Sequence, residues 1–563
     1  MKQITKSILT LLCSIVALIS CDKSEAEQPI LTADMASIEV VANNPDDVSV
    51  ALTSNTTWIV LAPNWITPSA TYGSGNAILT FKFEPNYKDE LTSKPVRHGE
   101  IKISGGGTLN GKGAVITIPV TQLGYTYVDP TPSIGGIDSA TELIKFTKAV
   151  SEGTSLKRWT NDNGDVVLLA DIDLTGITEW TPAGAVSATG QPKFEGTSFS
   201  GVFDGQGHKI TGINWTFNLT ESPIHAFGLF GSLNNATVKN LVLGSENGND
   251  KITLVGSIDK VISTGALVGY AQNSTITGIT NYVDVALAGK GAAVPGDNLN
   301  NVLMTLGGVV GSAMSPMSIG SQAGPIKNYG DVSTGKISNE KNGGTGMTVG
   351  GVAAFTVSVS NAELKMDYCF NYGTISAPTG RGGGLVGTMG GVNSKDATAK
   401  SIISNSENYG LVQDDVDGLM YGGATNKAGN KRMGGLVGGT VDNSTGMLIE
   451  NCINKGNVFS QVGCRVGGFV GHNNVTIKGC KNEGVILGDI TTTEKDGQTI
   501  PNHAPGWACG YNGKKEYIIS CTMGGKVGSW TEYKDNPSAA PAATADNAIG
   551  YNNASAFDPS TNN

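Results

Sequence analysis

The pentapeptide Gly383-Gly384-Leu385-Val386-Gly387 is one copy of a short motif that recurs along most of the chain. In each copy, small residues flank two or three apolar ones. The other copies are GLFG at 228–231, GALVG at 265–269, GGVVG at 307–311, GGVAA at 350–354, GGLVG at 434–438, GGFVG at 467–471 and the degenerate ACG at 508–510. Successive copies begin roughly 30–50 residues apart, a period typical of stacked repeat architectures.

A second motif, in which an asparagine is followed two residues later by glycine, alternates with the first. Its copies, each followed within two residues by Val or Ile, are KNYG at 327–330, FNYG at 370–373, ENYG at 407–410, INKG at 453–456 and KNEG at 481–484. Each repeat therefore carries two short strands that end at glycine corners. We predict a parallel β-solenoid whose interior is formed by the Leu, Val and Phe side chains of the first motif. Stacked asparagine amides are expected to hydrogen-bond along its axis.

These two patterns resemble the GLUG repeat family. DIDL at 171–174 and FSGVFDGQGHKI at 199–210 are similar to the first coils of those proteins. The resemblance spans roughly residues 138–530. It implies a parallel β-helix, and a fold of this kind does not by itself imply a function.

An amphipathic helix is predicted at the start of this region, where it would cap the end of the solenoid. Asp138 or Ser139 is the expected N-cap, and Glu142 stands where the acid of a capping box would. The apolar stripe of the helix comprises Leu143, Phe146, Ala149 and Val150. At the other end of the chain, residues 531–563 are expected to form a loosely ordered tail or a poor final cap.

Residues 30–125 alternate apolar and polar side chains between turn-forming residues, which predicts a β-sandwich. They resemble the BACON domain, an immunoglobulin-like module of Bacteroidetes surface proteins, in SNTTW at 54–58, NWI at 64–66 and ITIPVTQ at 116–122. The resemblance implies a spacer or a carbohydrate-binding module. Trp58 and Trp65 could stack on a sugar, although core packing is favoured for tryptophan. Residues 126–137 are predicted to form a stiff linker.

Residues 1–20 are typical of a secretory signal, because Lys2 and Lys6 precede an apolar run at 8–19 that is short for a membrane span. LISC at 18–21 resembles the lipobox of bacterial lipoproteins, which implies cleavage before Cys21 and acylation of that residue. Residues 21–29 are predicted to be a flexible tether.

The acidic run DKSEAE at 22–27 within this tether resembles the signal that exports Bacteroidetes lipoproteins to the outer leaflet. We therefore expect an outer-membrane protein, held by N-terminal acyl chains, that faces the cell exterior. A cleaved secretory peptide with an incidental Cys21 and an inward-facing lipoprotein are the alternatives.

Composition narrows the possible partners. Glycine accounts for 78 of the 563 residues, charged residues make up 15%, and the net charge is −10. Many glycines with little charge suit a chain with many tight corners rather than a disordered one. The acidic balance argues against nucleic acid as a partner.

Six cysteines follow Cys21: Cys369, Cys452, Cys464, Cys480, Cys509 and Cys521. All of them except Cys464 and Cys509 fall at one position of the repeat, in line with Ser406 of an intervening copy. No C-x-x-C pair occurs, which argues against zinc and thioredoxin-type sites. Buried thiols in an inward column are favoured, and disulfides between adjacent coils are the alternative.

Carboxylates offer the only candidates for catalysis. Asp171 and Asp173 would share one strand face about 7 Å apart, a separation that suits an inverting glycosidase. They lie in a segment that the family resemblance implies is a structural coil, as do Asp204 and His208, so a turn-stabilising role is favoured. DDVDG at 414–418 could hold calcium, but it lacks the EF-hand spacing, and a solvated acidic loop is favoured.

The histidines do not indicate a catalytic or metal site either. The five histidines lack metal-ligand spacing: His98, His208, His225, His472 and His503. GHN at 471–473 is faintly similar to a polygalacturonase element but has no flanking aspartates. We predict no catalytic residue, no metal and no cofactor.

The most distinctive surface feature is aromatic. Tyr329, Tyr372 and Tyr409 directly follow the motif asparagine, and Tyr282 extends the series. If the asparagines point inward, strand alternation turns the tyrosines outward in a row. Such a row can bind sugar rings, or its members can simply pack against one another.

These expectations lead to a non-enzymatic surface lipoprotein that binds an extracellular polymer, a glycan above all. By family analogy it could be accessory to a SusC/SusD-type importer. An adhesin or structural surface protein is the alternative, and a β-helix polysaccharide lyase or hydrolase is less favoured.

Overall fold

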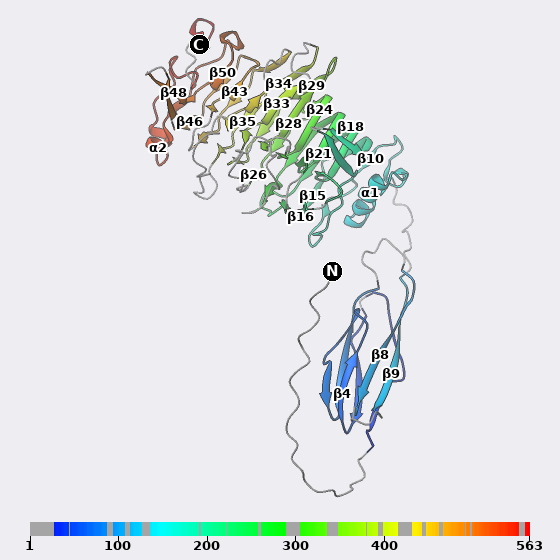
Figure 1. Ribbon diagram of the computed structural model, residues 1–563. Coiled ribbons are helices and arrows are strands. Elements are labelled where there is room, and N and C mark those ends of the chain that lie inside the picture. Colours follow the sequence, from blue (N-terminus) through cyan, green and yellow to red (C-terminus); the bar gives the residue numbers. More distant parts are fainter. Residues whose placement is uncertain are drawn as a thin grey trace, which may run out of the picture. The chain divides into compact units, whose positions relative to one another are not determined.

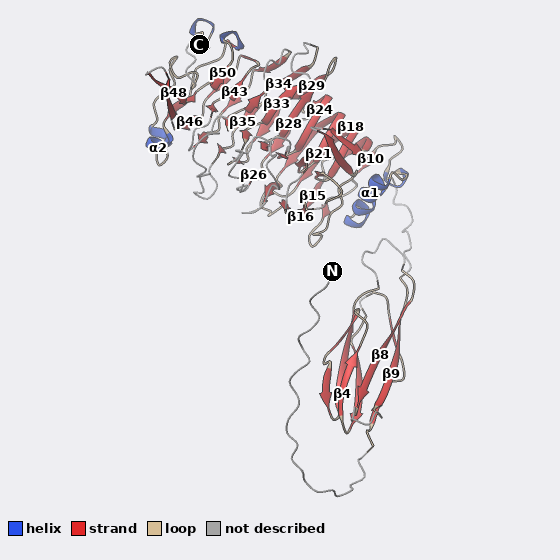
Figure 2. Cartoon of the chain, in the orientation of Figure 1, coloured by secondary structure: helices blue, strands red, loops and turns tan. Residues whose placement is uncertain are grey.

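The computed structural model of the chain describes residues 28–562 except 44, 87–93, 107–112, 126–134, 191–192, 221, 257–259, 289–303, 335–346, 379, 392–397, 415–430, 442–445, 461–464, 490, 496–497 and 551–557. The predicted leader, Cys21, most of the tether and linker, Cys464 and residues 415–418 lie outside the described residues. The chain divides into two compact units, Met1–Pro130 and Thr131–Asn563. Both are built from strands, which confirms the predicted all-β class (Figures 1 and 2).

The N-terminal unit is a β-sandwich, as predicted. One sheet has the order β1 (Leu31–Ala33), β3 (Val48–Ser54), β7 (Ala77–Phe83) and β5 (Ile66–Pro68). The other has the order β2 (Ile38–Val40), β9 (Ala114–Gln122), β8 (Arg97–Gly105), β4 (Thr57–Leu61) and β6 (Tyr72–Ser74). Every second side chain faces the shared core, as in β3, where Val50 and Leu52 are buried.

Both tryptophans of the sandwich belong to this core. Trp58 is 4% exposed and its Nε1 donates to the carbonyl of Gly75 at 2.9 Å. Trp65 is 9% exposed and lies under the guanidinium group of Arg97, 4.3 Å from its ring centroid. Neither ring face is presented for stacking on a sugar.

The second unit is a parallel β-helix, also as predicted. One sheet consists of β17 (Ala226–Phe227), β20 (Ile262–Gly265), β23 (Met304–Gly307), β27 (Met347–Gly350), β32 (Arg381–Gly383), β37 (Arg432–Gly434), β42 (Arg465–Gly467) and β49 (Pro505–Gly506). A second consists of β16 (Asn214–Asn218), β19 (Lys251–Val255), β22 (Asp284–Leu287), β26 (Val332–Thr334), β31 (Ile375–Ser376), β36 (Val412–Gln413), β41 (Val458–Ser460), β46 (Val485–Gly488) and β52 (Lys526–Gly528). Each strand pairs in parallel with the equivalent strand of the next coil.

The remaining strands of each coil join in one long sheet that bends at corners between them. Its first half contains β10 (Val166–Val167), β11 (Ile172–Asp173), β14 (Phe199–Asp204), β15 (Lys209–Thr211), β18 (Phe230–Leu243), β21 (Val268–Asn281), β24 (Val310–Ile319), β25 (Ile326–Asn328), β28 (Ala353–Ser358), β29 (Glu363–Asp367) and β30 (Cys369–Asn371). Its second half contains β33 (Val386–Gly391), β34 (Lys400–Ser404), β35 (Glu407–Asn408), β38 (Val437–Thr440), β39 (Met447–Glu450), β40 (Ile453–Asn454), β43 (Val470–Asn473), β44 (Thr476–Lys478), β45 (Lys481–Asn482), β50 (Cys509–Asn512) and β51 (Ile518–Ile519).

Two antiparallel hairpins interrupt the coils. They are β12 (Val186–Gly190) with β13 (Lys193–Gly196), and β47 (Thr491–Lys495) with β48 (Gln498–His503). They lie in insertions between strands of the coils and so leave the parallel pairing of the repeats intact.

The first motif forms the apolar interior. Its apolar residues align in one buried column: Phe230, Val268, Val310, Ala353, Val386, Val437, Val470 and Cys509. The second glycine of the motif leaves room for the asparagine of the other motif. A Cβ on Gly308 would lie 2.5 Å from Cγ of Asn328, a distance that real Cβ atoms do not show.

The motif asparagines form a continuous buried ladder, as predicted. Each Nδ2 donates to the Oδ1 of the next coil: Asn281 to Asn328 at 2.8 Å, Asn328 to Asn371 at 2.9 Å, Asn371 to Asn408 at 2.8 Å, Asn408 to Asn454 at 3.0 Å and Asn454 to Asn482 at 2.8 Å. The second N–H of each amide donates to a backbone carbonyl two residues further on. Burial strengthens such bonds because no water competes for them.

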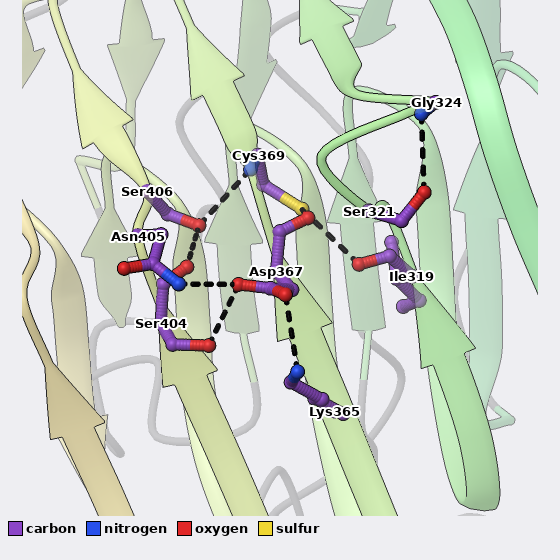
Figure 3. Close-up of polar contacts among 9 residues, drawn as sticks. All are labelled: Ile319, Ser321, Gly324, Lys365, Asp367, Cys369, Ser404, Asn405 and Ser406. Carbon is purple, nitrogen blue, oxygen red and sulfur yellow. Dashed lines mark hydrogen bonds and ion pairs between the residues drawn. The ribbon is translucent and has the colours of Figure 1, made fainter.

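Another corner requires left-handed backbone on five successive coils. The residues are Tyr368 (φ 53°), Asn405 (φ 46°), Asn451 (φ 52°), Gly479 (φ 62°) and Ser520 (φ 51°). Figure 3 shows how one coil is held there: Asp367 accepts hydrogen bonds from Ser404 Oγ at 2.8 Å and Asn405 Nδ2 at 2.9 Å. Lys365 pairs with the same carboxylate at 3.0 Å. Burial raises the pKa of Asp367, but these contacts outweigh it and lower the pKa overall.

Helix α1 (Ala140–Glu152) covers the first coils, with Ser139 as its N-cap. Leu143 and Phe146 are fully buried, as expected. The predicted capping-box role of Glu142 is wrong. Its side chain turns inward and binds Arg158 at 2.7 Å and Trp159 Nε1 at 2.9 Å, because the short 3₁₀ helix η1 (Lys157–Trp159) brings both donors beneath α1.

The last coil is also covered. The described residues after 529 include α2 (Trp530–Tyr533), η5 (Pro537–Ala539) and η7 (Pro559–Thr561). Trp507 Nε1 donates to the carbonyl of Thr544 at 2.9 Å, and Asn562 Oδ1 accepts from the amide of Cys521 at 2.8 Å. These contacts favour the final cap over the loose tail.

Candidate functional site: a stacked tyrosine row

Backbone hydrogen bonds between coils set the position of each tyrosine in the row. Each tyrosine directly follows a ladder asparagine, and its amide donates to the coil before it. Tyr329 donates to Asn281 O, Tyr372 to Asn328 O and Tyr409 to Asn371 O, each at 2.7 Å. Since the asparagine points inward, the next side chain points outward at the same height on every coil.

The four rings stack in one column, which confirms the predicted row. Centroid separations are 4.9 Å for Tyr282–Tyr329, 4.6 Å for Tyr329–Tyr372 and 4.6 Å for Tyr372–Tyr409, with interplanar angles of 13°, 7° and 15°. This spacing matches the distance of about 4.8 Å between neighbouring strands. The rungs of the solenoid therefore set the spacing of the rings.

Stacking decides which part of each ring is offered to solvent. Tyr329, Tyr372 and Tyr409 are 38%, 37% and 39% exposed, so their outer edges and hydroxyl groups are accessible. The ring faces that point along the row are covered by the neighbouring tyrosines. A sugar cannot stack on the face of a middle ring, but it can lie along the ridge of ring edges and hydroxyl groups.

A charged pair closes the C-terminal end of the row. Lys455 occupies the tyrosine position of the next coil, with Nζ 4.5 Å from the ring centroid of Tyr409. It also pairs with Glu407 at 2.6 Å, and both groups bind the hydroxyl of Tyr409. The hydrogen bond to Glu407 raises the pKa of Lys455, so the ammonium group of this ion pair stays protonated at neutral pH.

The pKa values of two tyrosines of the row, Tyr282 and Tyr372, are raised, so these two hydroxyl groups stay protonated at neutral pH. Burial, together with the neighbouring Glu246 and Tyr329, raises the pKa of Tyr282. Burial, together with the tyrosines on both sides, raises the pKa of Tyr372. Neutral phenols donate and accept hydrogen bonds, which is the chemistry that sugar hydroxyl groups match.

The candidate catalytic carboxylates are engaged in local structure. Asp171 Oδ1 accepts from the amide of Lys209 and contacts His208 Nδ1, both at 3.0 Å. Asp173 Oδ1 accepts from the amide of Thr175 at 2.9 Å and from its hydroxyl at 2.6 Å. The pKa of Asp171 is lowered first by the Lys209 amide, and that of Asp173 first by the Thr175 hydroxyl. A general acid needs a raised pKa, so neither group is suited to that role.

The described members of the remaining candidate groups are engaged in local contacts as well. Asp204 accepts from the Gln206 amide at 2.9 Å and pairs with Lys239 at 3.3 Å. Asp414 pairs with Lys431 at 3.6 Å. Among the described residues, no group of three or more His, Cys, Asp or Glu side chains is arranged to hold a metal ion.

The cysteines at the common repeat position are buried free thiols in the structure. Cys369, Cys452, Cys480 and Cys521 are fully buried, and so is Cys509. Cys452 donates its amide to Sγ of Cys480 at 3.4 Å, and Cys369 donates its amide to Ser406 Oγ at 3.0 Å. Burial raises the pKa of Cys369, which keeps it an unreactive thiol.

A row of arginines escaped the sequence analysis. Arg381, Arg432 and Arg465 align on β32, β37 and β42. The signal was present, because each arginine lies two residues before the double glycine of the first motif. The arginines are not part of the motif as it is defined above, because that motif is defined by its glycine and apolar residues.

Comparisons with known proteins do not assign the chain. No protein-family model matches it, so the resemblance to BACON and GLUG modules stays a prediction, and no curated protein matches it either. A Bacteroides ovatus GH5 xyloglucanase in complex with a XXXG heptasaccharide is similar at 9% identity, over 33% of this chain and 37% of that chain, with a TM-score of 0.14. An IgA1 protease is similar at 15% identity, over 76% of this chain and 27% of that chain, with a TM-score of 0.31.

Both similarities are too low to carry an argument about activity, and the chain matches only about a third or less of each protein's length. Within the part of the chain that the structure describes, no helix is long and apolar enough to cross a membrane.

Proposed function

We propose that this protein is a non-enzymatic surface protein that binds an extracellular glycan along the side of its solenoid. The observation that carries the proposal is the tyrosine row. It repeats a stacked phenol ring on four successive coils at strand spacing, and three of these rings, those of Tyr329, Tyr372 and Tyr409, are more than a third exposed. A polymer that repeats its own hydroxyl groups can make the same weak contact several times, and repetition raises the overall affinity.

The predicted leader supports a location at the outer membrane. Acylation at Cys21 would tether the chain to the outer membrane, and the BACON-like sandwich would act as a spacer between lipid and solenoid. Stable anchoring needs more than one acyl chain, which lipoprotein processing supplies. A SusC/SusD-type importer is the proposed membrane partner.

The proposal of a non-enzymatic role rests on Asp171 and Asp173. Both carboxylates bind backbone amides and have lowered pKa values, which supports a structural role. Hydrolysis of a glycoside would need one carboxylic acid that is protonated near neutral pH.

Affinity electrophoresis of the full chain against neutral and acidic polysaccharides tests the proposal. Retardation by at least one glycan, without release of reducing ends, is the expected result. Retardation by none would contradict glycan binding, and release of sugar products would assign an enzyme instead. Binding to cells or matrix proteins without any glycan retardation would favour an adhesin.

A further inference from the structure

The outer face of one sandwich sheet carries exposed apolar side chains on neighbouring strands. Tyr72 on β6 lies opposite Ile59 on β4, and Ser104 on β8 stands between Ile59 and Val115 on β9 (Figure 1). The exposed fractions of Tyr72, Ile59 and Val115 are 76%, 52% and 62%, and Leu61, two residues beyond Ile59, is 62% exposed. These four side chains form the apolar row. The solvated face of a sheet is normally polar, so the apolar row indicates an interaction surface.

The apolar row lies near the end of the sandwich where the described chain begins. Pro29 packs against Gly106, because a Cβ on that glycine would lie 2.5 Å from Cβ of Pro29. Gly106 follows Ser104 by two residues, about 7 Å of extended chain. Ile30 is 51% exposed, and its amide donates to Oδ1 of Asn55, in the turn before β4, at 2.7 Å. The first residues of the sandwich therefore adjoin the strand ends that carry the row.

The length of the preceding chain limits how far this end can move from a membrane anchor. Six residues, 22–27, separate Cys21 from Gln28, the first described residue. Even when fully extended, the chain from Cys21 to Gln28 spans at most about 25 Å. If Cys21 is acylated, as proposed above, the apolar row stays close to the bilayer and meets it at a high effective concentration. A separate protein partner has no such advantage.

The side chains of the row suit a phospholipid surface. The amphipathic ring of Tyr72 is of the kind enriched at membrane interfaces, and aliphatic side chains beside it can enter the acyl boundary. Lys102, opposite Leu61, pairs with Glu100 at 3.0 Å, so the two charges offset each other. We propose that the apolar row docks the sandwich on the phospholipid surface to which Cys21 anchors the chain. This inference rests on the acylation in the proposed function and does not depend on glycan binding.

Nitroxide labels on the two faces of the sandwich test the docking. The acylated full chain is reconstituted in vesicles of phosphatidylethanolamine and phosphatidylglycerol. One label replaces Ser74, exposed beside Tyr72 on β6, and the other replaces Ser49, exposed on the outer face of the opposite sheet. The ratio of accessibility to oxygen over accessibility to a water-soluble nickel complex should be at least about threefold higher for Ser74→Cys than for Ser49→Cys. Equal, water-like ratios would overturn the docking.

The variant I59T/Y72T/V115T removes most of the apolar row and keeps β-branched side chains on the strands. It should abolish the difference between the two labels. In sedimentation of the Cys21→Ala full chain with the same vesicles, it should partition at least about tenfold less than its parent, because three apolar side chains no longer enter the lipid.

The matched control is V41T/I78T/V96T, which removes three other exposed apolar side chains of the sandwich. It should partition within about twofold of its parent. Equal loss in both triple variants would overturn the assignment to the apolar row. Binding that requires phosphatidylglycerol and disappears at high salt would overturn it too, because charges would then hold the sandwich. So would self-association without vesicles that only I59T/Y72T/V115T abolishes, since a second copy would then cover the row.

Mass spectrometry of the N-terminal peptide separates this inference from the proposed location. An unmodified Cys21 would contradict the anchoring and the docking that rests on it. An acylated Cys21 combined with water-like labels at Ser74 and Ser49 would overturn the docking alone. Glycan retardation of the full chain is expected to be the same in both cases.

Discussion

The side-chain amide of Asn371 donates to the side-chain oxygen of Asn408 at 2.8 Å, with both residues fully buried. Asn408 in turn donates to Asn454 and to the carbonyl of Gly410. Each amide in this ladder thus holds the coil before it and the coil after it. Asparagine is usually found at protein surfaces, but in this ladder it is buried and links neighbouring coils.

Replacing Asn408 by alanine is expected to lower the free energy of unfolding by about 3 kcal/mol or more, because several buried polar atoms lose their partners. Chemical denaturation measures the change. Asn214→Ala, at an exposed strand position, is the control and should stay within about 0.5 kcal/mol of the parent. Equal stability of both variants would show that the ladder is not a source of stability.

Tyr368 has the left-handed conformation that Asn405 and Gly479 adopt on other coils. A bulky residue pays a steric cost there that asparagine largely avoids. Tyr368→Asn is therefore expected to raise the free energy of unfolding by about 1 kcal/mol. Glu363→Asn, on the extended strand just before the corner, should not raise the free energy of unfolding. If Tyr368→Asn lowers the free energy of unfolding, the packing of the Tyr368 ring contributes more stability than its left-handed backbone costs.

We expect the Glu142 carboxylate to make the stability of the protein depend on pH. Burial raises its pKa, but bonds from Arg158, Lys145 and Trp159 outweigh burial and lower the pKa from 4.5 to about 2. A lowered folded-state pKa means that the contribution of Glu142 is present above pH 4.5 and is lost as the pH falls towards 2.

Thermal unfolding of Glu142→Gln across this range checks the prediction. The difference from the parent chain should be several kcal/mol at neutral pH, since the buried Arg158 loses its ionic partner, and should shrink below pH 4. Glu152→Gln, which breaks an exposed pair with Lys148 on the same helix, should change stability little at any pH. A pH-independent difference for Glu142→Gln would contradict the assigned pKa.

The tyrosine row allows stacking and binding to be separated. Tyr372→Phe keeps the ring between Tyr329 and Tyr409 but removes the hydroxyl, so it should unfold like the parent and bind the retarding glycan more weakly. Tyr372→Ala should lose about 1–3 kcal/mol of stability as well, because both neighbouring rings lose a partner. If Tyr372→Phe binds as well as the parent, the hydroxyl ridge is not the binding surface.

Periodicity explains which features could be predicted from the sequence. The asparagine ladder and the tyrosine row repeat at fixed offsets from glycine, so a parallel solenoid follows from their alignment alone. Arg381, Arg432 and Arg465 also repeat at a fixed offset, two residues before the double glycine, so the same logic extends to them.

Structural features that occur only once in the chain cannot be predicted from the repeat pattern. Glu142 fits a capping box locally, but its partners Arg158 and Trp159 reach it only through tertiary packing. The terminal cap depends on single contacts such as Trp507 with Thr544, in a stretch whose composition is typical of a tail. The left-handed backbone at Tyr368 could not be predicted, because a bulky residue such as tyrosine rarely adopts that conformation.

The central claim is that identical contacts on successive coils add up to glycan binding. Calorimetric titration of the full chain with oligosaccharides of increasing length, cut from the polysaccharide that retards it most, tests this directly. The dissociation constant should fall steeply with each added sugar until the ligand spans the row, and then level off. A dissociation constant that does not depend on length would contradict the claim, because a single local site would then account for all the binding.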